Sequence, residues 1–122
     1  RWSRFGVPVY LDKPVALELT ELEALLRLRQ ESGVPWETGS SWRFSAGWEA
    51  LAKDVREWGR ELKIDGAWFD RPGQSGWCWY GIHGVELLCH GLGSEVESVR
   101  VSRAGDRRGL ECGFSGGRWG LY

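Results

Sequence analysis

The side chains best suited to chemistry in this sequence are three cysteines and two histidines, all in its second half: Cys78, His83, Cys89, His90 and Cys112. A zinc site needs several such side chains at short spacings such as C-x₂-C or H-x₃-H. Neither spacing is present. We therefore expect no metal and no cofactor. The odd number of cysteines argues against a disulfide framework, so we interpret them as buried thiols in a reducing, cytoplasmic compartment.

A cysteine nucleophile needs a neighbouring base and a third group that orients this base. Adjacent residues of a strand point to opposite faces, so Cys89 and His90 cannot form such a pair if this segment is a strand. Cys89 with His83, or Cys112 with His90, remains compatible with strand geometry. The acids available to orient such a base are Asp70 and Glu86. A hydrolase with a carboxylate pair would instead use two of Asp65, Asp70, Glu86, Glu95 and Glu97.

Motifs that bind nucleotides or catalytic metals are missing. The sequence contains no Walker loop, no G-x-G-x-x-G after a strand and no H-E-x-x-H. The 16 basic and 17 acidic residues give a net charge of −1, so no overall field steers the protein towards nucleic acid or an anionic membrane. No apolar run reaches the roughly 18 residues of a membrane span. These observations leave catalysis open and favour a non-catalytic role.

The nine tryptophans are unusual for 122 residues, and they exceed what one core of this size comfortably hides. We expect Trp36 and Trp42, at the two ends of a polar loop, and Trp2, near the start, to be exposed. Tryptophan and arginine are enriched at binding hot spots. We therefore predict a Trp/Arg-rich binding surface that comprises Trp36, Trp42, Arg71, Trp77, Trp79, Arg107, Arg108 and Trp119.

The first hypothesis for function is a small, non-catalytic protein-binding module, such as an inhibitor, an immunity-like protein or an accessory subunit, with another protein as its partner. An alternative is a domain that binds single-stranded nucleic acid, because Trp77 and Trp79 share one face of an expected strand and bases stack on such aromatic side chains. A further alternative is a small hydrolase that uses the Cys/His pairs or the carboxylates named above.

The elements of the first half are predicted from their spacing. A short strand is expected over residues 7–11, and the period-two alternation over 15–19 predicts a second strand. Thr20 and Glu23 match a capping box, in which each side chain bonds the backbone N–H of the other residue. A helix is therefore expected over residues 21–32.

A second helix is predicted over residues 46–62, with Ser45 as its N-cap. Its apolar residues recur at helical spacing and form one stripe, which we expect to face the core. The residues of this stripe are Trp48, Leu51, Ala52, Val55, Trp58 and Leu62.

The second half reads as short strands joined by glycine-rich turns. Strands are expected over residues 77–83 and 85–90, around Val99 and Val101, from Leu110 to Phe114, and over 118–122. The predicted fold class is α+β, with two helices of the N-terminal half packed on one face of a mainly antiparallel sheet that ends in a meander. We expect one domain over residues 1–122. Because the chain starts at Arg1 and contains no methionine, we also expect this domain to be a processed or excised part of a longer chain.

Overall fold

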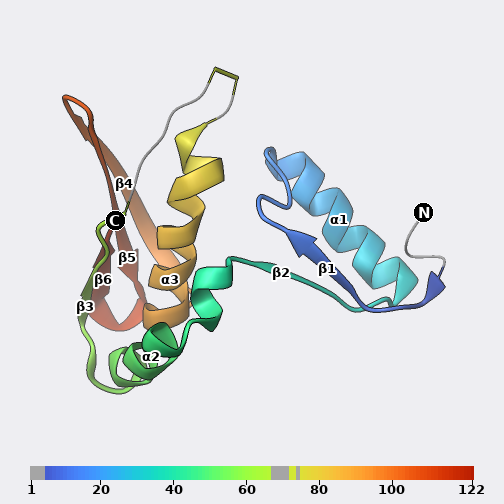
Figure 1. Ribbon diagram of the computed structural model, residues 1–122, viewed down its shortest axis with the longest axis horizontal. Helices are drawn as coiled ribbons and strands as arrows, with labels where there is room; N and C mark the ends of the chain where they lie inside the picture. The colour runs from blue at the N-terminus through green and yellow to red at the C-terminus, as the bar shows by residue number, and fades with distance from the viewer. Residues whose placement is uncertain (1–4, 67–71, 74) are drawn as a thin grey trace. The chain divides into compact units, whose positions relative to one another are not determined.

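The computed structural model describes residues 5–66, 72–73 and 75–122, and the chain divides into two compact units, Arg1–Ser40 and Ser41–Tyr122 (Figure 1). The first unit holds a two-stranded parallel sheet and the second a four-stranded mixed sheet. Helices accompany both sheets, so the predicted α+β class is confirmed. None of the helices in these ranges is long and apolar enough to cross a membrane.

The first unit is a β–α–β arrangement. Strand β1 (Val9–Asp12) pairs in parallel with strand β2 (Trp36–Gly39), and helix α1 (Leu19–Ser32) connects them. Two parallel neighbours require such a crossover connection, because a tight turn can join only antiparallel strands. The strand expected over residues 7–11 is confirmed in β1, whereas no strand forms over 15–19.

Helix α1 begins two residues before the predicted start. The Glu21 carboxylate accepts hydrogen bonds from the backbone N–H groups of Leu17 (3.0 Å) and Glu18 (3.2 Å). These donors stabilise the ionised form and lower the pKa of Glu21. The cap therefore lies at Glu18 and not at Thr20. At the other end, Gly33 has a φ of +64° and its N–H donates to the Arg29 carbonyl, which ends the helix.

The sheet of the second unit has the order β3-β6-β5-β4. Strands β4 (Val96–Ala104), β5 (Arg107–Phe114) and β6 (Arg118–Leu121) form the predicted antiparallel meander. The short helical turn η4 (Ser115–Gly117) joins β5 to β6. Strand β3 (Glu61–Lys63) pairs with β6 in parallel and makes the sheet mixed.

The strands predicted over residues 77–90 are wrong, because this segment is helical. A π-helical segment, η3 (Trp77–Gly81), leads directly into helix α3 (Ile82–Leu92), which lies beside the sheet in Figure 1. Gly84 and Gly91 of α3 are buried sites of close packing. A methyl group at Gly84 would overlap the Tyr122 ring, and one at Gly91 would crowd the side chains packed there.

Helix α2 (Ala46–Trp58) follows the turn η2 (Ser41–Phe44), and Ser45 caps it as predicted by accepting a bond from the Trp48 amide. The helix ends four residues before the predicted end, and Leu62 instead lies buried in β3. Of the expected stripe, Trp48, Ala52 and Val55 are buried, but Leu51 and Trp58 are 48% and 77% exposed.

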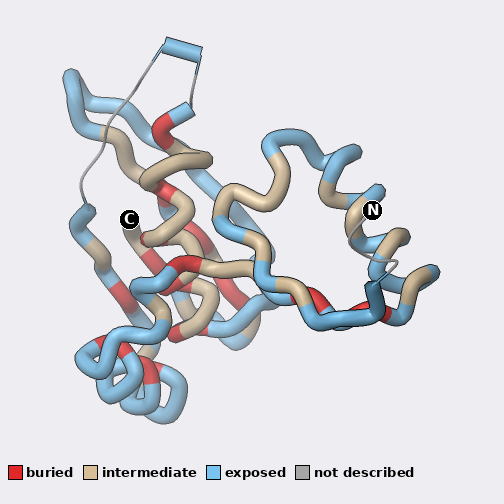
Figure 2. The backbone as a smooth tube through the Cα atoms, turned by 45° about the vertical axis from the view of Figure 1, so that its right-hand side comes forward, coloured by how far each residue is buried: buried red, intermediate tan, exposed pale blue. Residues whose placement is uncertain are grey.

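One hydrophobic core holds the second unit together. Its most deeply buried large side chains are Leu88 of α3 and Phe114 of β5, which are 0% and 1% exposed. Figure 2 shows the buried positions along α3 and the strands beside it, whereas β4 is exposed over its whole length. The buried members are Trp48, Ala52, Val55, Leu62, Leu87, Leu88, Leu92, Leu110, Cys112 and Phe114.

Candidate active site

One face of helix α3 carries three polar side chains that sequence patterns did not group together. His83, Glu86 and His90 follow the spacing i, i+3, i+7, which places them on the same side of a helix. The opposite side bears the buried Leu88 and Leu92. The turn η2 and helix α2 supply the side chains that contact this polar face.

The first contact is a ring stack. The indole of Trp42 lies on the imidazole of His83 with 4.7 Å between ring centroids and 15° between ring planes. Trp42 is 44% exposed, which agrees with the prediction that it reaches the surface. His83 is half-buried at the start of α3.

The second contact is an ion pair one turn along. Arg43 Nε lies 3.5 Å from Glu86 Oε1, and the two side chains are only 22% and 20% exposed. The Arg43 guanidinium also lies over the Phe44 ring, 4.7 Å from its centroid. A charge pair that is mostly withdrawn from water is screened less than a surface pair. The Arg43–Glu86 ion pair therefore holds η2 against α3 beside His83.

The third contact fixes His90. Trp48 Nε1 donates a hydrogen bond of 2.8 Å to His90 Nδ1, and Arg56 donates one of 3.2 Å to the His90 carbonyl. Burial, followed by the nearby positive charges of Arg56 and Arg43, lowers the pKa of His90. A nitrogen that accepts a bond carries no proton, so the neutral ring holds its proton on Nε2. We conclude that His90 serves the structure.

The cysteines do not complete a nucleophilic site. Burial raises the pKa of both Cys89 and Cys112, and each thiol lies in or against the core. A protonated thiol is a poor nucleophile. On α3, Cys89 lies away from the face of His83, which contradicts the parity expected from a strand. Within the described ranges, no three His, Cys, Asp or Glu side chains gather to hold a metal ion.

The predicted Trp/Arg surface is divided among several places. Trp36 is buried in β2, contrary to the expected exposure. Trp77 and Trp79 lie on the helical segment η3, where residues two apart point to nearly opposite sides, so they form no shared face. Trp119, 42% exposed, belongs to β6. Arg107 and Arg108 begin β5, and Arg71 and Trp2 lie outside the described residues.

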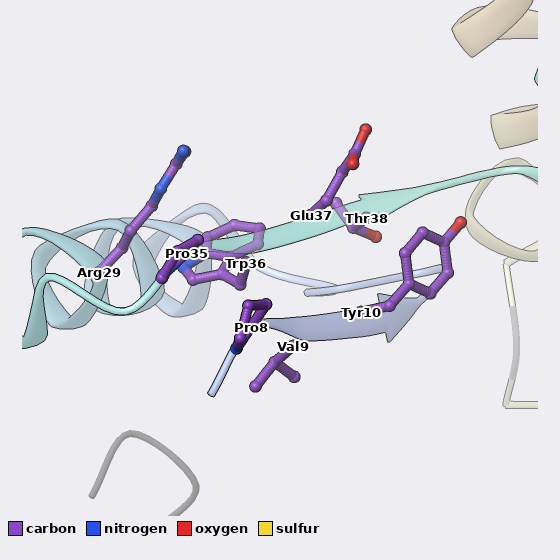
Figure 3. A pocket seen from close by; sticks show the side chains of 8 residues that line it. All are labelled: Pro8, Val9, Tyr10, Arg29, Pro35, Trp36, Glu37 and Thr38. Carbon is purple, nitrogen blue, oxygen red and sulfur yellow. The ribbon is translucent and has the colours of Figure 1, made fainter. Parts of the chain in front are cut away.

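The first unit has a pocket of its own, of about 750 Å³, at the start of the two parallel strands (Figure 3). Trp36 lies on its wall, and the Arg29 guanidinium lies 5.5 Å from the centroid of the indole. Trp36 Nε1 is buried and has no hydrogen-bond partner among the described residues. Pro8 and Pro35 add apolar wall, and the other polar side chains that line the pocket are Tyr10, Glu37 and Thr38.

Comparisons with known proteins find no matching family model and no matching curated protein. Solved structures do match. A dehydrogenase from Chromobacterium violaceum has 20% identity and a TM-score of 0.73 over 98% of this chain and 40% of its own. An oxidoreductase from Agrobacterium radiobacter, in complex with NAD+, L-tartaric acid and magnesium, has 17% identity and a TM-score of 0.72 over 98% of this chain and 41% of its own.

This likeness shows a shared fold, and the chain spans about two fifths of the length of these oxidoreductase chains. It overturns the hypothesis of a non-catalytic protein-binding module. The alternatives of a single-stranded nucleic-acid binder and a small hydrolase are not retained either. The number of tryptophans led to a wrong prediction of one binding surface, because the described tryptophans are distributed among buried positions, a ring stack and separate exposed positions.

Proposed function

We propose that this chain is part of a dehydrogenase and that the polar face of α3 belongs to its substrate site. The observation that carries this proposal is the fold shared with two oxidoreductases over 98% of the chain. The site adds the chemical argument, because His83 brings an imidazole to a partly exposed helix face beside an aromatic ring.

The first unit supports the same class of enzyme but holds no dinucleotide by itself. A β–α–β unit with parallel strands is the repeating element of nucleotide-binding sheets. Pyrophosphate binding there needs a glycine-rich turn and a helix start open to anions. Just before α1, the backbone N–H groups of Leu17 and Glu18 instead donate to the Glu21 carboxylate. We therefore assign no nucleotide contact to the described residues.

The role assigned to His83 is that of a general acid–base. When an alcohol is oxidised to a carbonyl, the carbon loses a hydride to the electron acceptor and the hydroxyl loses a proton, which a base must take. An imidazole titrates in the range in which such a base works. His90 is unsuited to this role, because its Nδ1 lone pair accepts the Trp48 bond and its other nitrogen holds the proton.

The test uses the protein in its native form, isolated from its source. We expect reduction of NAD+ with one or more members of a panel of L-tartrate, other 2-hydroxy acids and polyols. His83→Asn should lower kcat by about 10²–10⁴-fold, the usual contribution of a general base, while binding of NADH is kept. His90→Gln, whose amide oxygen can accept the Trp48 bond, should stay within a few-fold of wild type.

Two results would contradict the proposal, the first in whole and the second in part. The first is that the native protein neither binds NADH nor oxidises any member of the panel. The second is that His83→Asn turns over as fast as the wild type, which would leave the oxidoreductase class but exclude His83 as its base.

A further inference from the structure

We propose that Trp42 is a positioning residue for His83: its indole ring sets the plane in which the imidazole takes and returns a proton. This inference rests on the proposed function for its catalytic meaning. The arrangement of the two rings does not depend on that function and can be tested without measuring turnover.

The stack has the geometry of a support. Rings that lie 4.7 Å apart and within 15° of parallel cover each other by their faces. Rotation of the imidazole out of this plane would drive its edge into the indole. Both nitrogens of an imidazole lie at the ring edge, so a stacked face restricts the orientation of the ring without covering the atoms that exchange protons.

Trp42 can act in this way because its own backbone is held. The Trp42 carbonyl accepts hydrogen bonds from the Ser45 hydroxyl (3.0 Å) and the Ser45 amide (3.2 Å). Ser45 is also the N-cap of α2. The next residue, Arg43, is paired with Glu86 on α3. The turn η2 is thus held by contacts to both helices, which restrict how Trp42 can move relative to α3.

The indole also suits the charge that His83 acquires. An aromatic face attracts a cation placed over it, and among aromatic side chains tryptophan does so most strongly. When His83 takes the substrate proton, the resulting imidazolium already lies over the Trp42 ring. An aliphatic side chain in this place would fill the space but would not provide this attraction.

The first measurement is NMR of the histidine ring protons. The chain contains only two histidines, so His90→Gln assigns both sets of signals. Stacking on an indole shifts the His83 ring protons upfield by its ring current. We expect Trp42→Leu to abolish this shift, Trp42→Phe to keep part of it, and the His90 signals to stay unchanged. The matched control is Trp58→Leu, which removes a tryptophan that is 77% exposed on α2.

The second measurement is the pH profile of kcat and KM in the native protein. Displacement of a catalytic group can lower the rate by up to about 100-fold. We therefore expect Trp42→Leu to lower kcat by about ten- to 100-fold, with little change in KM. The acid limb of its pH profile of kcat should also be displaced. Trp42→Phe should restore most of this loss. Trp58→Leu should leave both constants and the profile as in the wild type.

The outcomes separate the two proposals. Unchanged His83 ring shifts in Trp42→Leu overturn the positioning role, whether or not the protein is an oxidoreductase. A lost shift in a protein without dehydrogenase activity keeps the stack and overturns the proposed function. A lost shift with unchanged kcat and an unchanged pH profile also overturns the positioning role, because the stack would then be packing only.

Discussion

At the scale of single residues, the protonation of His90 is governed by the hydrogen bond that its ring accepts. His90 Nδ1 receives the Trp48 N–H at 2.8 Å, and Trp48 is only 8% exposed. Protonation of Nδ1 would therefore break this bond and leave a buried donor without its partner. Arg56 and Arg43 disfavour the positive charge further, whereas Glu86 and Glu49 favour it only partly.

The first prediction is a loss of stability in mild acid. The pKa of His90 is lowered in the folded state from 6.5, so the unfolded chain binds the proton more tightly. The His90 contribution is therefore fully present above the unfolded value and is lost as the pH falls from there through the folded value. Urea unfolding of the chain between about pH 8 and about pH 5 should show this decrease.

His90→Gln is the control for this pH dependence. The amide of Gln does not titrate in this range and can still accept the Trp48 bond. The variant should therefore have a smaller decrease in stability over the same interval. An equal decrease in the wild type and in His90→Gln would show that other groups cause the pH dependence.

The second prediction compares two glycines at the ends of α2. Gly47 faces open space, so Gly47→Ala should stabilise the protein by up to about 1 kcal/mol, the helix preference of Ala over Gly. At Gly59 a methyl group would lie 2.7 Å from the Val55 carbonyl oxygen, which is backbone and cannot move aside cheaply. Gly59→Ala should therefore cost about 1–3 kcal/mol, as overpacking does.

Thermal unfolding of both variants in parallel tests this comparison. The φ of Gly59 is −73°, an angle that alanine adopts easily. Its cost must therefore come from the contact with Val55. A Gly59→Ala variant as stable as the wild type would show that the end of α2 relaxes, and a destabilised Gly47→Ala would contradict the open space assigned there.

At the scale of elements, one arginine of the sheet secures the ends of both helices of the second unit. Arg118 of β6 donates to the Leu92 carbonyl (2.7 Å) at the end of α3 and to the Arg56 carbonyl (3.1 Å) near the end of α2. The last carbonyls of a helix have no partner within it, and they carry the negative end of the helix dipole. A cation that spans both carbonyls therefore stabilises both helix ends.

The third prediction is that Arg118→Gln destabilises the protein by about 1.5–3 kcal/mol, the range for hydrogen bonds to charged groups. The control is Arg60→Gln. Among the described residues, the exposed side chain of Arg60 makes a single such bond, to the Gly116 carbonyl, so its replacement should cost less. Urea unfolding followed by circular dichroism measures both. Equal losses in the free energy of unfolding would show that the two hydrogen bonds of Arg118 stabilise the protein no more than the single bond of Arg60.

The elements that sequence patterns predict well are those whose periodicity comes from a single buried face. Helix α2 follows its stripe of Trp48, Ala52 and Val55, and the meander follows its alternation and its glycine turns. The predicted stripe was too long, because periodicity continues through Trp58 and Leu62 although the chain leaves the helix at Gly59. Periodicity predicts which face of α2 is buried, whereas the backbone contact at Gly59 determines where the helix ends.

The candidate site was missed because α3 was predicted as strands. Gly81, Gly84 and Gly91 lower intrinsic helix preference, and apolar residues on most sides of the segment hide the helical period. Tyr122 approaches the helix closely at Gly84, and side chains of the core do so at Gly91. Only the helix brings His83, Glu86 and His90 together. Their spacing of three and seven residues was the available signal, and it has meaning only once a helix is assumed.

At the scale of the whole molecule, the two units differ in what they bury. All members of the hydrophobic core belong to the second unit. In the first unit the buried described residues are Val34, Trp36 and Ser40, and α1 buries none of its side chains. Large apolar side chains of this unit, such as Leu19 (70%) and Leu17 (59%), are exposed.

The fourth prediction follows from this difference: residues 41–122 fold alone, and residues 1–40 do not. An isolated two-stranded sheet is marginal in water, and a helix of this length needs tertiary packing to persist. We expect the fragment 41–122 to show helix and strand in circular dichroism and a cooperative thermal transition, and the fragment 1–40 to show neither. An unfolded 41–122 would mean that its core depends on the first unit. A folded 1–40 would mean that local helix preference and the Glu21 cap suffice, so that a β–α–β unit of this kind needs no wider sheet around it.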